Sequence, residues 1–230
     1  MKIYSFTFAR KGSKGLKNKN LKKIKKKTLV NIAITHAKKS KYISKIFLST
    51  DCPNIAKEGI QAGASVPFYR PKSLAHDKSP EWLSWQHSLN FLKKNKDFPD
   101  IFVSIPCTSP LRKVKDIDKM ILKLMKNKQL DALVAVTKSH RNPYFNMISL
   151  SNKLKAKITL KSKRRIFRRQ DCPAVFDLTT IAFVVRARFI LKAKHLFAGN
   201  VQGYVVDKKT AIDIDDEIDL KIAKNLANEL

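Results

Sequence analysis

The sequence predicts an α/β protein whose sheet is mainly parallel. Short apolar runs alternate with stretches in which apolar residues recur at helical spacing, and this alternation continues to Thr137. The apolar runs are nearly continuous, which is typical of strands that are buried on both faces of a parallel sheet. The pattern therefore indicates βαβ units, with helices on both faces of the sheet and ligand sites at the carboxyl ends of the strands.

The individual strands and helices can be placed in order up to this point. The strand-like runs are IYSFTF, KIFLST, SVPFY, DIFVSI and DALVAVT, at residues 3–8, 45–50, 65–69, 100–105 and 131–137. The helical patterns are TLVNIAITHAKK, PNIAKEGIQAG, PEWLSWQHSLNFLKK and VKDIDKMILKLMKNK. Polar loops follow several of the strands, and we expect them to meet at one edge of the sheet.

The alternation stops after Thr137. Residues 140–177 contain two short strand-like runs, YFNMISL and KLKAKITL, and then the basic run KSKRRIFRRQ. This segment resembles an inserted arm, and because apolar residues on a projecting arm need burial, we expect it to mediate self-association. The main domain resumes with TIAFVVRARFIL and VQGYVVD and ends in a helix from Asp216, so residues 1–230 are expected to form one domain.

The composition favours a soluble, cytoplasmic protein. The chain has 230 residues, 43% of them hydrophobic, and its three cysteines show no paired spacing, so we expect neither disulfides nor a zinc site. No signal peptide or membrane-spanning run is visible. The net charge of +30 would attract any polyanion, but the lysines are spread over many water-facing positions rather than gathered in one stripe. Nucleic-acid binding is therefore the rival interpretation.

A loop rich in glycine and lysine follows the first strand. FARKGSKGLKNKN, residues 8–20, holds two glycines, one arginine and four lysines. Glycines let backbone N–H groups approach an anion, and the cations surround it with positive charge, so the loop indicates phosphate binding. Neither the Walker spacing nor G-x-G-x-x-G is present, since Gly12 and Gly15 are only three apart. The alternative is that a lysine-rich protein places lysine in every surface loop.

Paired aspartates lie near the C-terminus in AIDIDDEIDL. If this segment is strand-like, Asp213 and Asp215 point to one face, where two carboxylates suit a magnesium ion that also holds phosphate. The alternative is a helix start, in which acidic residues complement the helix dipole. We assign that role to Asp216 and Glu217, and the magnesium site to the earlier pair.

Six blocks of sequence together resemble the acylneuraminate cytidylyltransferases, the CMP-sialic acid synthetase family. They are ARKGSKGLKNKNL, STDCPNIA, FYRPKSLAHD, TSPLRKVKDID, RRQDCPAVF and IDIDDEIDL, and they occur in the family's order and rough spacing over essentially the whole chain. The resemblance implies a Rossmann-like nucleotide-diphospho-sugar transferase fold and a homodimer formed through the inserted arm. It also implies a reaction in which CTP and a nonulosonic acid give a CMP-sugar and pyrophosphate.

The resemblance assigns the phosphate loop to the triphosphate of CTP. Arg10, Lys14 and Lys19 match the family's cationic positions, and Gly12 and Ser13 offer backbone and hydroxyl donors. In this reaction a sugar hydroxyl attacks the α-phosphorus while several existing charges must be held still. Positioning and charge neutralisation are therefore expected to carry most of the catalysis.

Further matched positions lie around the nucleotide. Asn20 is expected to contact the nucleotide or the loop itself, and Arg70 and Asp77 fall around the base and its loop. Asp213 and Asp215 match the family's magnesium-binding pair. The resemblance implies that the metal bridges phosphate oxygens and lowers the pKa of the attacking hydroxyl.

On the sugar side the sequence departs from the family. Pro106 stands where many sialic acid enzymes have Gln, Thr179 corresponds to a sugar-side Asn, and Phe183 to a nearby Tyr. These three changes argue against N-acetylneuraminate as the routine substrate. Arg169 matches the family's arginine for the sugar carboxylate. The two tryptophans of DKSPEWLSWQHSL replace a small-residue run, so they either shape the pocket or pack a helix face.

Two alternatives stay open at this point. A cytidylyltransferase for 3-deoxy-manno-octulosonate shares the reaction and general fold, but the GSKGL, RRQ and IDIDDEIDL blocks match the acylneuraminate branch better. A non-enzymatic basic RNA-binding protein would explain the charge but not the aspartate pair. The sequence does not name the sugar acid.

Overall fold

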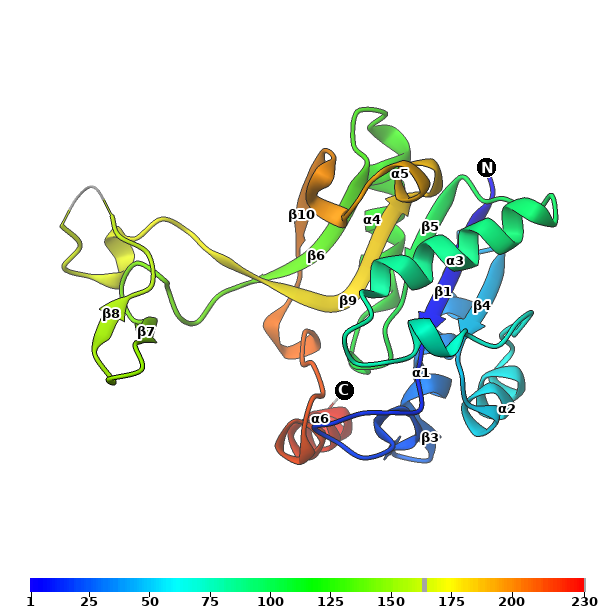
Figure 1. The fold of residues 1–230 in the computed structure, drawn as a ribbon, viewed down its shortest axis with the longest axis horizontal. Helices are drawn as coiled ribbons and strands as arrows, with labels where there is room; N and C mark the ends of the chain where they lie inside the picture. Colours follow the sequence, from blue (N-terminus) through cyan, green and yellow to red (C-terminus); the bar gives the residue numbers. More distant parts are fainter. Residues whose placement is uncertain (163–164, 230) are drawn as a thin grey trace.

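The computed structural model describes residues 1–162 and 165–229, and its centre is a six-stranded sheet in the order β10-β6-β9-β5-β1-β4 (Figure 1). The strands are β1 (Ile3–Phe8), β4 (Lys45–Ser49), β5 (Ile101–Ser104), β6 (Ala132–Lys138), β9 (Phe176–Arg186) and β10 (Val201–Val205). β9 runs antiparallel to both of its neighbours, and the remaining pairings in this sheet are parallel. The prediction of a mainly parallel sheet is confirmed.

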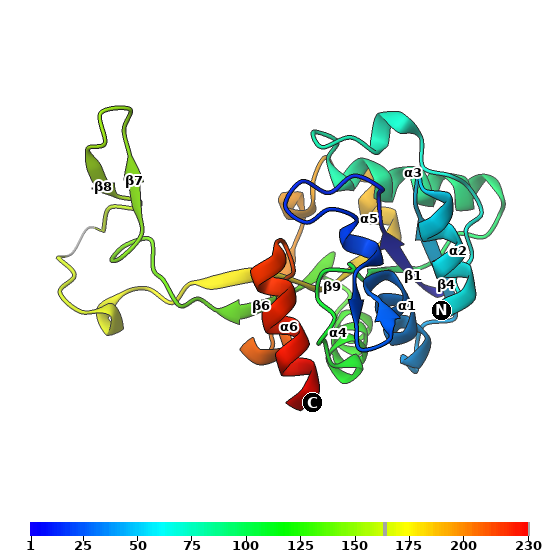
Figure 2. The same ribbon diagram turned by 90° about the horizontal axis from the view of Figure 1, so that it is seen from below.

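Helices cover both faces of the sheet, as the alternating pattern predicted (Figures 1 and 2). On one face lie α1 (Leu29–Lys39), α2 (Pro53–Ala62), α4 (Val114–Lys126) and α6 (Glu217–Glu229), and on the other α3 (Glu81–Lys94) and α5 (Ala187–Lys192). Alternate residues of β1 supply the two cores, since Ile3 joins the first cluster while Tyr4 and Phe6 join the second. The second core is mostly aromatic, with the Phe6 and Phe102 rings stacked at 4.4 Å.

One expected strand is not formed. Within residues 65–69, Ser65 and Tyr69 make only isolated bridges to Phe47 and Thr50 beside the edge of the sheet. Pro67 lies between them, and because proline has no N–H to donate, it interrupts a continuous ladder. Two features were not expected, namely the 3₁₀ turn η1 (Lys19–Leu21) and the short ribbon of β2 (Lys23–Ile24) and β3 (Lys27–Thr28).

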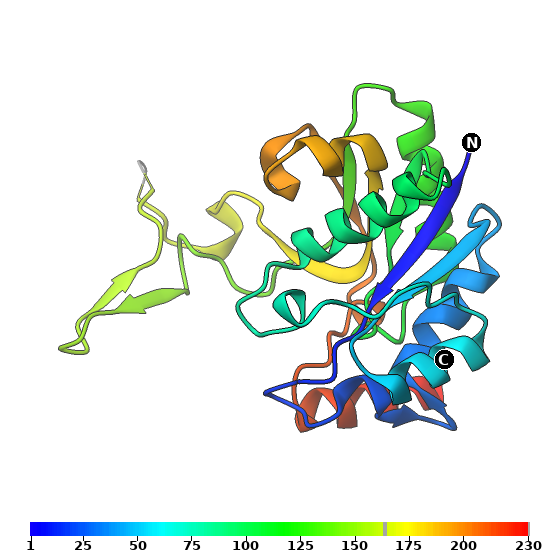
Figure 3. The same cartoon turned by 45° about the vertical axis from the view of Figure 1, so that its right-hand side comes forward.

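The inserted segment projects from the body between β6 and β9, at residues 139–175 (Figures 1 and 3). Its two short strands, β7 (Ile148–Leu150) and β8 (Ala156–Ile158), pair as a hairpin in which every residue is exposed. The basic run KSKRRIFRRQ is described except at residues 163 and 164, which lie outside the described part. Apolar side chains on the arm face solvent, with Leu154 77% and Phe167 70% exposed. We call this segment the arm.

The loops after β1, β4, β5 and β10 meet at one edge of the sheet (Figure 3). This is the consequence of parallel strands, whose carboxyl ends share one edge. In the described part of the chain, no helix has the length and apolar character needed to cross a membrane. The shared edge is where the sequence predicted a ligand site.

Candidate active site

The phosphate loop, residues 9–22, is held by one hydrogen bond within the loop and one to Asp51. Asn20 Nδ2 donates to the Arg10 carbonyl at 3.0 Å, and the Lys11 N–H donates to Asp51 Oδ1 at 2.8 Å. Leu16 is buried and holds the loop on the first apolar cluster. Of the two contacts expected for Asn20, the structure shows the one to the loop itself.

The two loop glycines differ in what surrounds them. A Cβ on Gly15 would lie 2.5 Å from the carbonyl oxygen of Asp215, whereas a Cβ on Gly12 would meet nothing within 4 Å. Gly15 therefore allows the loop to touch the segment that carries the paired aspartates. Gly12 borders open space, which leaves the backbone accessible to a ligand.

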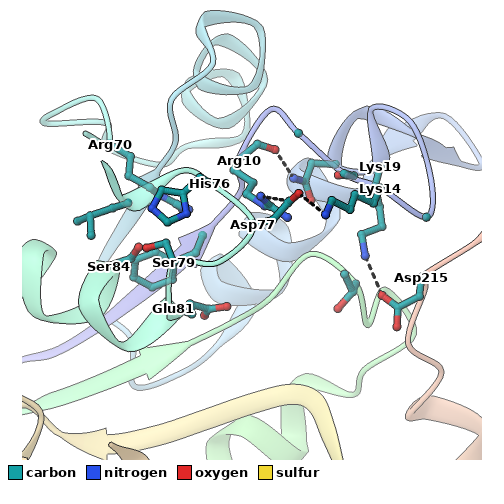
Figure 4. A pocket seen from close by; sticks show the side chains of 17 residues that line it. Arg10, Lys14, Lys19, Arg70, His76, Asp77, Ser79, Glu81, Ser84 and Asp215 are labelled. Atoms are coloured by element: carbon teal, nitrogen blue, oxygen red, sulfur yellow. Dashed lines mark hydrogen bonds and ion pairs between the residues drawn. The ribbon is translucent and has the colours of Figure 1, made fainter. Parts of the chain in front are cut away.

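Three cations of the phosphate loop, Arg10, Lys14 and Lys19, are paired with acidic side chains (Figure 4). Asp77 accepts from both Arg10, at 2.5 Å, and Lys14, at 2.8 Å, while Lys19 is 2.9 Å from Asp215. The hydrogen bonds from Lys14 and Arg10 hold the pKa of Asp77 below its usual range. All five side chains line a cavity of about 500 Å³ together with Gly12 and Ser13. In this cavity the carboxylates of Asp77 and Asp215 thus pair with Arg10, Lys14 and Lys19.

Arg70 lies in the same cavity and is held rigidly. It is 7% exposed, and it donates from Nε to Ser49 Oγ at 3.1 Å and from Nη2 to the Ser49 carbonyl at 2.6 Å. Its guanidinium also lies over the Phe8 ring, 5.5 Å from the centroid. Burial lowers the pKa of Arg70, although an arginine stays cationic at neutral pH.

A second cavity, of about 440 Å³, adjoins the first. The two share Phe8, Asn20, Glu81, Thr108 and Asp215 in their walls, so they form one continuous cleft. The second cavity has mostly apolar walls, built by Trp82, Trp85, Pro106, Cys107, Phe183 and Leu196. Both tryptophans also belong to the aromatic core, so they pack the helix and shape the cavity at once.

The paired aspartates border this second cavity from a segment that is not a strand. The expectation of a strand-like segment in AIDIDDEIDL is wrong, because residues 211–216 are irregular. The Ile214 N–H holds this segment in place by donating to the Thr108 carbonyl at 2.9 Å. Both carboxylates nevertheless line the cavity. Asp213 Oδ1 is buried and has no hydrogen-bond partner in the described part of the chain. An unused buried carboxylate oxygen next to a second carboxylate fits a magnesium ligand set completed by phosphate and water.

The start of α6 accounts for the acidic residues that follow. Asp216 Oδ1 accepts from the N–H groups of Ile218 and Asp219, at 2.8 and 2.9 Å. Asp219 Oδ2 accepts in return from the N–H of Asp216 at 3.1 Å, which is a reciprocal capping arrangement. The last helix was expected from Asp216; α6 begins one residue later, at Glu217, and Asp216 caps it.

The sugar-side positions are only partly brought together. Pro106 and Phe183 line the second cavity, but Thr179 is buried elsewhere and its hydroxyl donates to the Ala135 carbonyl at 2.9 Å. Thr180 lines the cavity instead. The β6–β9 pairing shifts register between Val134 and Val136, so simple alternation along β9 fails to predict which threonine faces the cleft. We therefore replace Thr179 by Thr180 as the candidate contact.

Arg169 lies on the arm and outside both cavities of the cleft. Its Nη2 donates to the Ser139 carbonyl at 2.9 Å, and it lines a separate hollow with residues at the base of the arm. The structure thus does not bring Arg169 together with the other candidate residues of the same chain.

The sequence reasoning gave no role to Glu81 and Thr180, which line the cleft, or to Arg112, which is bonded to two residues of its wall. Arg112 is 3% exposed, and its Nη2 donates to the carbonyls of Pro106 and Thr180. Burial lowers the pKa of Arg112 to about 10, and nearby Asp213 opposes this shift. The signal was present in the TSPLR block, where a charged residue follows an apolar turn, but no role was assigned to it.

Cys107 borders the second cavity without the properties of a nucleophile. It is buried, and burial raises the pKa of its thiol to about 12. A thiol with this pKa stays protonated at neutral pH, so thiolate chemistry is not expected here.

Comparisons with known proteins show which family the chain resembles. A family model described as "Cytidylyltransferase" matches residues 8–229. The chain is 32% identical over 224 residues to the post-translational flagellin modification protein B of Campylobacter coli, covering 96% of the chain and 93% of that protein. It is also 32% identical over 221 residues to the CMP-N,N'-diacetyllegionaminic acid synthase of Campylobacter jejuni, covering 95% and 92% respectively.

Solved structures show the same fold. One is a CMP:2-keto-3-deoxy-manno-octonic acid synthetase complexed with CTP, with a TM-score of 0.74 over 100% of both chains. The sequence identity to it is 15%, so this similarity concerns the fold alone. The predicted Rossmann-like fold of nucleotidyltransferases is confirmed.

Proposed function

The chain belongs to the cytidylyltransferase family, and from that premise we propose how its cleft carries out the reaction. The enzyme transfers the cytidylyl group of CTP to a nonulosonic acid and releases pyrophosphate. The observation that carries the assignment of residues is the cation cluster of Arg10, Lys14 and Lys19, which lies in one cleft with Asp213 and Asp215.

The phosphate loop binds the triphosphate. Phosphate oxygens take the place that the carboxylate of Asp77 now occupies on Arg10 and Lys14, and they compete with Asp215 for Lys19. Cations fixed before the reaction stabilise the charge that grows on the bridging oxygen as pyrophosphate leaves. The open space beside Gly12 is where backbone N–H groups reach the same anion.

Asp213 and Asp215 hold magnesium in this proposal. The support is the buried, unpartnered Oδ1 of Asp213 and the position of Asp215 between both cavities. When bound, the ion would neutralise phosphate charge and make the attacking sugar hydroxyl more acidic. Arg112, buried near Asp213 and bonded to the Pro106 and Thr180 carbonyls, keeps this wall of the cleft in position.

The sugar acid binds in the second cavity. Its apolar walls suit a substrate that presents methyl or acyl groups rather than many hydroxyls, as acetamido groups do. This supports a nonulosonic acid with two acetamido groups, the substrate class in the name of the Campylobacter jejuni relative. Thr180 supplies a hydroxyl on that wall. Use of CTP also makes the cytoplasm the expected location.

The arm completes this site in a homodimer. Arg169 lies outside the cleft of its own chain, while the arm exposes apolar side chains such as Leu154 and Phe167. A second copy that covers these side chains would receive Arg169 beside the carboxylate of its sugar acid. Dimerisation would then be needed for sugar binding.

The test is pyrophosphate release from CTP and magnesium with a panel of sugar acids. The panel contains N-acetylneuraminate, N,N'-diacetyllegionaminate and 3-deoxy-manno-octulosonate. We expect turnover with the diacetamido acid and little with N-acetylneuraminate. Turnover with 3-deoxy-manno-octulosonate alone would favour the second cytidylyltransferase class, and absence of turnover together with tight RNA binding would favour the non-enzymatic alternative.

A further inference from the structure

A separate cavity of about 850 Å³ lies outside the cleft and shares none of its lining residues. Its walls come from the β2–β3 ribbon, α1, the loop before α4 and the end of α6, and these helices lie on one face of the sheet (Figure 2). Sites for small molecules have volumes of roughly 300–1,000 Å³. This cavity, which we call the lysine cavity, is thus large enough for a ligand of its own.

The lysine cavity is lined by cations that lack acidic neighbours in its wall. These cations are Lys25, Lys26, Lys27, Lys39, Arg112 and Lys113, and no Asp or Glu is among the described residues that line the cavity. Of the six, Lys113 alone forms an ion pair in the described part of the chain, with Asp207 at 3.5 Å. The cleft differs, because Asp77 and Asp215 pair with its cations. Unpaired cations around one hollow attract an anion.

Arg112 is the buried member of this group, and its hydrogen-bonding capacity is only partly used. Its Nη2 donates to the carbonyls of Pro106 and Thr180, but its Nε and Nη1 are buried without a partner in the described part of the chain. Buried donors without acceptors cost free energy, and an anion held against the guanidinium would supply the acceptors. His36, in the same wall, also has a buried Nδ1 without a partner among the described residues.

The remaining wall of the lysine cavity is apolar. It is built by Ile24, Ile32, Pro110, Leu111 and Ala227. An inorganic anion would leave this surface in contact with water, whereas an aromatic or acyl body would cover it. We propose that the lysine cavity binds a small organic anion with an apolar body, and that this anion regulates the cleft through Arg112.

Arg112 connects the lysine cavity to the cleft. Pro106 and Thr180, whose carbonyls accept from Nη2, line the apolar cavity to which we assign the sugar acid. An anion that pairs with the guanidinium competes with these carbonyls for its donors and loosens that wall. Anion binding then weakens sugar-acid binding, and by reciprocity the sugar acid weakens anion binding. This regulatory step rests on the proposed function, whereas anion binding itself does not.

The first test is a calorimetric titration of the whole chain with naphthalene-1-sulfonate at low ionic strength. The sulfonate serves as the anion and the naphthalene ring as the apolar body, and no turnover is needed. Inorganic sulfate should bind about tenfold or more weakly than the sulfonate, because it covers no apolar wall. Absence of sulfonate binding, or sulfate binding of equal strength, would overturn the proposed ligand class.

Two triple variants show whether the probe binds in the lysine cavity. Exposed lysines of the cavity are removed in the first, Lys26→Ala with Lys27→Ala and Lys39→Ala, which should weaken sulfonate binding about tenfold. The control removes the same charge from exposed positions outside the cavity, with Lys57→Ala, Lys93→Ala and Lys94→Ala, and it should bind like the wild type. Equal losses in both variants would indicate attraction to the overall charge, and no loss in the first would place the probe elsewhere. Either result overturns the proposed site.

The second test measures the kinetics of the proposed reaction in the presence of naphthalene-1-sulfonate. The KM for the sugar acid should rise while the KM for CTP stays the same, and the rise should disappear in the first triple variant. An unchanged KM for the sugar acid, or an equal rise in that variant, would overturn regulation through Arg112. If no sugar acid is turned over, the proposed reaction is wrong, and the calorimetric titrations still decide whether the lysine cavity binds the anion.

Discussion

Asp213 has one buried carboxylate oxygen that is unused as an acceptor, which is a costly state for a carboxylate. Its Oδ1 lacks a partner in the described part of the chain, while the adjacent Ile214 N–H is bonded to Thr108 and holds the segment in place. An unsatisfied buried acceptor costs about 1–3 kcal/mol or more when charged. A bound cation would remove this cost, so the strain of the free state favours metal binding.

Replacement of Asp213 by Asn tests this reasoning. The amide keeps the shape but removes the charge from a preorganised site, so we expect kcat to fall about 100-fold or more. Magnesium titrations of activity and of CTP binding would show a weaker apparent affinity. Asp216→Asn, which changes the cap of α6 rather than the cleft, should retain magnesium affinity. Full activity in Asp213→Asn would exclude Asp213 as a ligand.

Gly15 sets a second constraint at the scale of a single residue. A Cβ there would lie 2.5 Å from the backbone oxygen of Asp215, so Gly15→Ala must push the phosphate loop away from the aspartate segment. We expect a loss of about 1–3 kcal/mol in the free energy of unfolding, as in other overpacked positions. Urea unfolding of Gly15→Ala and the wild type measures this difference in free energy. Gly12→Ala, with nothing within 4 Å, should unfold like the wild type, and equal losses in both variants would contradict the role of the close contact.

At the scale of elements, α1 carries a titratable group whose pKa differs strongly from that of the unfolded chain. Burial first, and then Arg112, Lys39 and Lys27, lower the pKa of His36 to about 3 from an ordinary value of 6.5. Between these two values the unfolded chain binds a proton that the folded chain does not. Stability therefore falls as the pH drops below 6.5, by up to about 1.4 kcal/mol per pH unit.

His36→Gln removes this proton linkage. The free energy of unfolding, measured in urea at pH 7 and pH 5, should then depend less on pH than in the wild type. His140→Gln, at an exposed position on the arm, should keep the wild-type dependence. The same slope in His36→Gln and wild type would show that His36 is protonated in the folded state.

The helices, strands and loops also show which parts of the fold and the site could be predicted from the sequence. Clear helical spacing predicted α1 to α4, and the glycine- and lysine-rich loop and the aspartate pair were found in one cleft. The failures arose where long-range contacts decide. Thr179 was taken from the family resemblance, but its hydroxyl is bonded to the Ala135 carbonyl and Thr180 faces the cavity, while the bond from Ile214 to Thr108 replaced an expected strand-like segment. Glu81 was missed because a lone acidic residue at a helix start resembles a dipole partner.

At the scale of the whole molecule, the body and the arm differ in whether their apolar side chains are buried. The body buries its apolar residues in two clusters, whereas the arm leaves Ile148, Leu150 and Leu154 between 57% and 77% exposed. An extended hairpin with exposed strands is not stable alone in water, so a partner is expected to cover it. Arg169 at the base of this arm connects assembly to substrate binding in our proposal.

The decisive prediction concerns dimers formed from two variants, Arg169→Ala and Asp213→Asn, each of which is expected to be inactive alone. If the arm acts on the neighbouring subunit, each mixed dimer has one site with both lesions and one intact site. Random exchange of equal amounts makes half of the dimers mixed, so about a quarter of wild-type activity should return. If Arg169 serves its own chain, every site carries one lesion and no activity returns. The control for a general loss of charge on the arm is Arg168→Ala. Arg168 is the neighbouring arginine and is paired with Asp171 at 3.0 Å. The Arg168→Ala variant should remain active by itself, because the exposed charge of Arg168 forms its ion pair within the arm.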